Sequence, residues 1–192
     1  FAFNDVNNEN SAWLSANGTY LNNGEYQASE STDGYTGEWV QVDIGQNIIL
    51  QSYEIHSRAT SAGNNADNRN PEKMRLFYSS DGTNWTQLRD WTGLTVANDW
   101  GGYGNYTSVG PYTSSVEGRY FRLVINKAIG TSEKQFTQVG ELELKGLTLS
   151  DKAINDAVND PVTPQQSSTG STLDISGLET NITATAINIS DA

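Results

Sequence analysis

The sequence predicts an all-β protein whose short strands pack as a sandwich, and three observations carry this prediction. Many segments alternate apolar and polar residues with a period of two, which is typical of half-buried strands. The 18 glycines, together with Asn and Ser residues between the alternating segments, indicate numerous turns. Only 35% of the residues are hydrophobic, but five Trp and nine Tyr supply large rings that can build a core.

The predicted strands follow one another from residue 39 to residue 146, and no helix is expected among them. Residues 45–47 (GQN) and 80–84 (SDGTN) are the clearest turns, the second being a hairpin signal. Trp39 and Trp85 lie on predicted strands, so we expect both rings in the core. The segments that indicate strands are Trp39–Ile44, two runs within Ile48–Arg58, Lys73–Tyr78, Trp85–Leu88, Arg119–Asn126 and Val139–Leu144.

The net charge of −12 excludes several classes of partner. Nucleic-acid binding needs a basic stripe that neutralises phosphates, and an anionic membrane surface would repel the chain. The chain has no Cys, which excludes disulfides and thiolate metal sites. Because no apolar run approaches the roughly 20 residues that span a bilayer, no membrane insertion is expected.

The composition divides the chain into three parts. We expect the sandwich over residues 1–146, a short helix and a linker over 147–171, and a β-type tail over 172–192. Ser150 is the expected N-cap of the helix, and the linker is rich in Pro, Gln and Ser. An isolated strand is not stable in water, so the strand predicted in the tail must pair with another one.

Motifs of one family stand in order in the first 146 residues. They are Ala2-Phe3-Asn4-Asp5 through Asn10-Ser11-Ala12-Trp13, Glu38–Gly45 (EWVQVDIG), Tyr78–Trp85 (YSSDGTNW), and Tyr120–Leu123 with Gly140–Glu143. Together they resemble the discoidin, or coagulation factor 5/8 type C, family, which includes the family 32 carbohydrate-binding modules. The resemblance implies a discoidin-like antiparallel β-sandwich of jelly-roll type that has no catalytic activity.

The resemblance also implies a structural Ca²⁺ beside the first motif. A hard cation of this kind needs six to eight oxygen ligands, roughly, from carboxylates and carbonyls. The residues that would supply them here are Asp5, Asn7, Ser11 and, from the last strand, Glu141. The alternative is a turn rich in Asn and Asp that holds itself together by bonds from side chain to backbone.

Sugar-binding members of the family use aromatic rings and a few polar groups in loops at one end of the sandwich. Two long loops, over residues 59–71 and 91–111, carry such groups here. The alternative for His56 and Arg58 is a pair at a strand end that only packs and forms hydrogen bonds. The candidate ligand-binding residues are His56, Arg58, Asn68, Arg69, Trp91, Trp100 and Tyr103.

An enzyme is not expected. His56 is the only His, so no Ser-His-Asp triad can be complete without it. Two carboxylates at the separation that a glycosidase needs are a weaker alternative, because the sequence shows no such distance.

Five sequons for N-glycosylation occur, close to the number that the composition gives by chance. Asn84 stands in the hairpin and Asn105 in a long loop, where a glycan would fit. The candidate acceptors are Asn17, Asn84, Asn105, Asn181 and Asn188.

The tail suggests assembly. The family's domain opens with a strand just before the first motif, and residues 181–190 (NITATAINIS) look like that strand. Ile182, Ala184 and Ala186 fall on one face of an extended segment and could enter the core of a neighbouring copy. Head-to-tail use of such a strand gives a filament. The alternative is that the tail folds on its own domain.

The leading functional prediction is a non-catalytic extracellular module for structure or adhesion. It would be a repeating subunit of a filament or a virion-surface fibre, with copies of itself as partners. The alternative is a calcium-stabilised carbohydrate-binding module from a larger secreted enzyme or adhesin, with cell-surface or extracellular glycans as partners. Both place the chain outside a cell, on a cell or virion surface.

Overall fold

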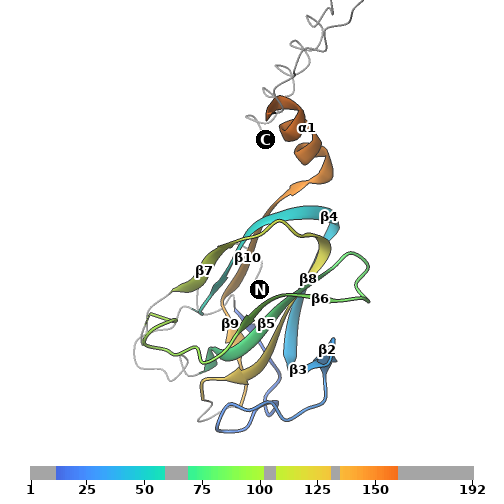
Figure 1. Cartoon of the computed structure of the whole chain (residues 1–192). Helices are drawn as coiled ribbons and strands as arrows, with labels where there is room; N and C mark the ends of the chain where they lie inside the picture. The colour runs from blue at the N-terminus through green and yellow to red at the C-terminus, as the bar shows by residue number, and fades with distance from the viewer. Residues whose placement is uncertain (1–11, 59–68, 102–106, 131–134, 160–192) are drawn as a thin grey trace, which may run out of the picture. The chain divides into compact units, whose positions relative to one another are not determined.

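The computed structural model describes residues 12–58, 69–101, 107–130 and 135–159, and within these ranges the longer regular elements are antiparallel strands apart from one helix (Figure 1). The predicted all-β class is confirmed. The chain divides into two compact units, Phe1–Ala157 and Val158–Ala192. The strands are β1 (Trp13–Leu14), β2 (Ser31–Thr32), β3 (Tyr35–Thr36), β4 (Glu38–His56), β5 (Pro71–Ser79), β6 (Thr86–Trp91), β7 (Ser108–Thr113), β8 (Glu117–Ala128), β9 (Gln138–Val139) and β10 (Glu141–Thr148).

The main sheet has the strand order β10-β4-β8-β5-β6, and β7 also pairs with β4. Two small ribbons accompany it, β1 with β9 and β2 with β3, and every strand pair is antiparallel. The hairpin predicted at residues 80–84 is confirmed, because it joins the paired strands β5 and β6. The Asp81 carboxylate fixes this turn by accepting hydrogen bonds from the backbone N–H groups of Thr83 and Asn84, both at 2.8 Å.

Strand β4 belongs to both layers of the sandwich. Its first half pairs with β8, from Glu38 opposite Ile125 to Asp43 opposite Tyr120. From residue 48 it pairs with β10; Ile48 and Ile49 still pair with β8 on the other side, and residues 52–56 pair there with β7. The turn expected at residues 45–47 is instead an irregularity within this one strand, where Gly45 has a φ of +86° and donates its N–H to Asp43 Oδ1 at 2.8 Å.

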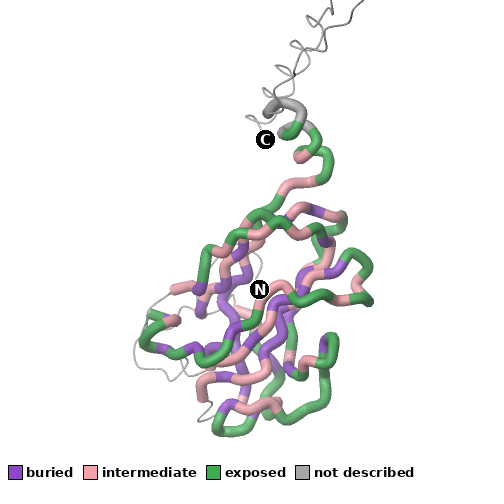
Figure 2. The backbone as a smooth tube through the Cα atoms, in the orientation of Figure 1, coloured by how far each residue is buried: buried purple, intermediate pink, exposed green. Residues whose placement is uncertain are grey.

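The core lies between the two layers. The buried residues, purple in Figure 2, follow the strands, whereas the turns are largely exposed. One hydrophobic cluster joins side chains of β5 and β8 to those of β7, β10 and the second half of β4, so the two halves of the sheet face each other. Its members include Val40, Leu50, Ile55, Met74, Leu76, Val109, Phe121, Leu123, Ile125 and Leu142.

Trp39 and Trp85 do not lie in this core, which corrects the prediction for both rings. The side chain of Trp39 is 38% exposed and Trp85 is partly buried. The Arg122 guanidinium lies 4.2 Å from the ring centre of Trp39 and 4.1 Å from that of Trp85. Gln41, two residues from Trp39, pairs with Arg122 across the strands and accepts its Nη2–H at 2.6 Å. Alternation therefore puts Val40 inside and Trp39 on the outer face.

Beyond the strands, helix α1 (Leu149–Asn159) lies within residues 147–171, where the sequence analysis expected a short helix. Its cap is Thr148 and not Ser150, because the Thr148 hydroxyl accepts the Asp151 N–H at 3.1 Å. In the part of the chain that the structure describes, no helix has the length and apolar character that a bilayer crossing requires. The linker and the tail, with Ile182, Ala184 and Ala186, lie outside the described residues.

The burial of Trp100 and the exposure of Trp39 predict that the two rings contribute differently to the free energy of unfolding. Trp100 is 1% exposed, so we expect Trp100→Ala to lower the free energy of unfolding by about 3–5 kcal/mol. Trp39→Ala should cost clearly less, because much of that ring already contacts water. Urea unfolding of both variants measures the two losses. An equal or larger loss for Trp39→Ala would place that ring in the core after all.

Candidate functional site

The end of β4 is the point where several parts of the chain meet. The Ser57 N–H donates to the Thr107 carbonyl at 2.8 Å, and the Thr107 N–H donates to Ser57 Oγ at 3.2 Å. The Gly140 N–H donates to the His56 carbonyl at 2.9 Å. A Cβ on Gly140 would lie 2.2 Å from the Ser57 carbonyl oxygen, so only glycine permits this approach. The end of β4 is thereby fixed against the starts of β7 and β10.

The two predicted ligand-binding arginines flank the segment 59–68. Arg58 directly precedes it and Arg69 directly follows it, and both are partly buried. The Arg69 guanidinium lies 4.7 Å from the ring centre of Phe136, and its carbonyl accepts the Thr137 hydroxyl at 2.8 Å. A guanidinium held in this way presents a fixed fork of hydrogen-bond donors. The other predicted residues of these loops, Asn68 and Tyr103, lie outside the described residues.

Trp91 and Trp100 are core residues, which corrects their prediction as rings that stack on a sugar. Trp91 is 6% exposed, and its Nε1–H donates to the Tyr112 hydroxyl at 3.2 Å. Trp100 is 1% exposed, and its Nε1–H donates to the Pro71 carbonyl at 3.0 Å. Stacking requires an accessible ring face, and neither ring offers one. Sequence alone did not separate them from loop aromatics, because both stand among polar and Gly residues.

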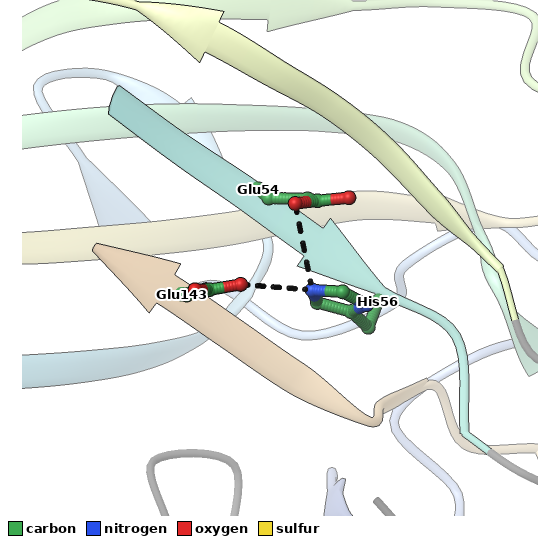
Figure 3. Close-up of side chains that lie close together, drawn as sticks. All are labelled: Glu54, His56 and Glu143. Atoms are coloured by element: carbon green, nitrogen blue, oxygen red, sulfur yellow. Dashed lines mark hydrogen bonds and ion pairs between the residues drawn. The ribbon is translucent and has the colours of Figure 1, made fainter. Parts of the chain in front are cut away.

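His56 lies on the outer face of β4, between two carboxylates that the sequence analysis did not single out (Figure 3). Its Nε2 is 3.4 Å from Glu143 Oε2 and 3.9 Å from Glu54 Oε2. Lys145, which forms a hydrogen bond with Glu143, and the nearby His56 hold the pKa of the Glu143 carboxyl below its usual value. Glu54 and His56 are two residues apart on one strand, so the sequence could have predicted that they share a face. The pairing of β4 with β10, which brings Glu143 to them, could not be predicted in this way.

Of the four residues predicted to bind calcium, only Glu141 is among the described residues. Glu141, the first residue of β10, is 7% exposed, whereas Asp5, Asn7 and Ser11 lie outside the described residues. A buried carboxylate is a ligand type that Ca²⁺ accepts, so Glu141 fits this role as far as the described residues go.

The sequons also stay predictions. Asn17 and Asn84 are exposed, and the Asn84 side chain donates to Asp81 Oδ2 at 2.7 Å. The other three, Asn105, Asn181 and Asn188, lie outside the described residues.

The antiparallel strands and the polar groups at the end of β4 place the chain in the class of β-sandwich modules. A family match over most of the sequence then identifies the family. Residues 2–142 match the F5/8 type C domain family, so the chain belongs to it. This confirms the resemblance drawn from the sequence motifs. No curated protein matches the chain.

Several solved structures are similar to the chain at low identity. CBM32-3, from a family 31 glycoside hydrolase of Clostridium perfringens, has 19% identity and a TM-score of 0.49, over 72% of this chain and 77% of that one. The family 32 carbohydrate-binding module of Streptococcus pneumoniae EndoD has 13% identity and a TM-score of 0.39, over 73% and 99%. CpGH89CBM32-5 of C. perfringens, solved with GalNAc-β-1,3-galactose, has 17% identity and a TM-score of 0.40, over 69% and 92%. The family assignment rests on the sequence match and not on these likenesses.

Proposed function

We propose that the chain acts outside the cell as a carbohydrate-binding module without catalytic activity. The observation that carries the proposal is the placement of Arg58 and Arg69 on either side of the segment 59–68, within a domain of the F5/8 type C family. This was the alternative prediction from the sequence, and it has more support than the filament subunit.

The physical argument for sugar binding rests on the two guanidinium groups. A sugar hydroxyl accepts hydrogen bonds from a guanidinium without the cost of burying a second charge. The packing of Arg69 on Phe136 and the hydrogen bonds of Ser57 with Thr107 restrain the chain on both sides of the segment 59–68. Such restraint lowers the entropy that binding must overcome. The net charge of −12 disfavours polyanionic glycans, so we expect a neutral one.

Catalysis is not part of the proposal. A glycosidase needs a carboxyl group whose pKa is raised, so that it can protonate the leaving group. The Glu143 carboxyl beside His56 does not offer this, since its pKa is lowered by Lys145 and His56.

Binding of a broad glycan array tests the proposal. We expect the wild-type chain to bind a subset of neutral glycans, and Arg58→Ala and Arg69→Ala each to weaken binding about tenfold or more, the value of a lost hydrogen bond to a charged group. Arg119→Ala is the matched control, because Arg119 is partly exposed on β8 and pairs with Asp43 at 2.6 Å. A blank array, or equal loss in the control, contradicts the proposal. Near-ultraviolet circular dichroism verifies that each variant is folded.

We further propose that a structural Ca²⁺ is bound by Glu141 with Asp5, Asn7 and Ser11. Calcium binds only the folded chain, so it should raise the melting temperature of a chelator-treated sample. At 100 times the dissociation constant the gain is about 2.7 kcal/mol. Glu141→Gln should abolish the rise, and Glu72→Gln, a control carboxyl that pairs with Lys127, should keep it. A melting temperature that does not respond to calcium removes this site.

Head-to-tail assembly through residues 181–190 stays a prediction, and a structural or adhesive role depends on it. The proposal rests on the sequence of the tail alone. Electron microscopy of the chain and of a variant without residues 180–192 tests it. We expect filaments from the chain of residues 1–192 and monomers from the truncated one, because an open sheet edge needs a partner strand. Filaments from both, or from neither, would refute assembly by this strand.

A further inference from the structure

Three side chains on the outer face of the paired strands β4 and β10 turn their polar atoms toward one another (Figure 3). Glu54 and His56 are two residues apart on β4 and therefore point to the same side. Glu143 of β10 is directly opposite Glu54 in the register of the two strands. One ligand atom from each of the three residues lies within 4.8 Å of the other two. The strand pairing thus brings an imidazole and two carboxylates together.

The two carboxylates are held by their far oxygens. The Ser108 hydroxyl of β7 donates to Glu54 Oε1. Lys145 Nζ lies 2.7 Å from Glu143 Oε1. In both residues the other oxygen, Oε2, faces His56 Nε2. Partners that hold one oxygen of a ligating carboxylate and aim the other are a regular part of protein metal sites.

The distances are close to those that a tetrahedral ion requires. Two ligand atoms, each about 2.1 Å from such an ion, lie about 3.4 Å apart. The distance from His56 Nε2 to Glu143 Oε2 is 3.4 Å, and the distance from the same nitrogen to Glu54 Oε2 is 3.9 Å. Small side-chain rotations would therefore complete the coordination. An imidazole with two carboxylates suits a transition metal such as zinc and does not suit calcium, which takes oxygen ligands.

The charges also favour a cation. Two carboxylates directly opposite on neighbouring strands repel each other. The exposed fraction is 19% for the Glu54 side chain and 13% for that of His56, so water screens the repulsion only in part. Lys145 offsets the charge of Glu143, but His56 Nε2 lies 3.9 Å from Glu54 Oε2, which is too long for a hydrogen bond. A divalent ion can contact all three groups at once.

One side of the cluster is open to solvent. A surface hollow lies beside it, lined by Ser52, Tyr53, Glu54, Pro111, Glu143 and Lys145. Two of these lining residues are the carboxylates of the cluster. A metal ion held there would have room for a water molecule as its fourth ligand, as in zinc sites with three protein ligands.

We propose that Glu54, His56 and Glu143 bind one divalent transition-metal ion, with Zn²⁺ as the representative, on the outer face of β4 and β10. Ser108 and Lys145 position the two carboxylates. The site uses neither the guanidinium groups of Arg58 and Arg69 nor the Glu141 carboxylate, and it assigns His56, which the sequence analysis placed among the ligand-binding residues, to the metal ion. The ion would fasten β10 to β4.

Titration calorimetry of tag-free, chelator-treated chain with zinc chloride tests the proposal. We expect one ion per chain, and we expect His56→Gln, Glu54→Gln and Glu143→Gln each to weaken binding by more than about tenfold, the effect of losing even an outer-shell partner. Glu117→Gln is the matched control, since it removes an exposed carboxyl on β8, which accepts a hydrogen bond from Asn47 at 3.1 Å, outside the cluster. It should bind as the wild-type chain does.

Two further measurements make the result decisive. Co²⁺ should give visible absorption bands that zinc displaces and that His56→Gln lacks. The rise of melting temperature with Ca²⁺ should be the same in His56→Gln as in the wild-type chain, which separates this site from the calcium site. No binding by the wild-type chain, or undiminished binding by folded Glu54→Gln and His56→Gln, overturns the proposal. If one variant fails to fold, the other two decide.

Discussion

The structure depends on the pairing of β4, a strand of 19 residues that takes part in both layers. Its first half is bonded to β8, and residues 52–56 lie between β7 and β10, so this one strand joins the β8-β5-β6 part of the sheet to β7 and β10. The register shift between Asp43 and Ile48 lets one continuous strand pass from one layer to the other. The strand keeps its backbone pairing on both sides of the shift. The core is closed because Val40 and Leu50, on the two halves, belong to one cluster.

The same strand sets the place of the proposed transition-metal site and of Arg58 in the proposed sugar site. Its last residues carry Glu54 and His56 on the outer face, while Tyr53 and Ile55 point into the core. Arg58 follows two residues after the strand ends. The inner side chains fix the strand in a close-packed interior, and this makes the positions of the outer ones reproducible. Two of the three side chains of the proposed metal site, Glu54 and His56, are therefore attached to a strand that the core holds in place.

The sequence predicted the class, the family and most strands, because these follow from local patterns such as the YSSDGTNW hairpin around Asp81. It failed where the outcome depends on distant partners. Alternation around Trp39 did not say which set of residues faces the core, and the register with Arg122 decided it. Trp100 stands in a loop segment and is nevertheless fully enclosed. The cluster around His56 needs the pairing of residues 54 and 143, which no local pattern contains.

Hydrogen exchange of the β4 backbone amides tests most directly whether this strand unites the two layers. If it does, the protected amides of residues 38–43 and those of residues 48–56 open only when the whole domain unfolds, and both groups exchange with the free energy of global unfolding. The urea dependence of exchange should then be equal for the two groups. If residues 48–56 exchange at a lower free energy while residues 38–43 stay protected, the layers are separate units and this account of the fold is wrong.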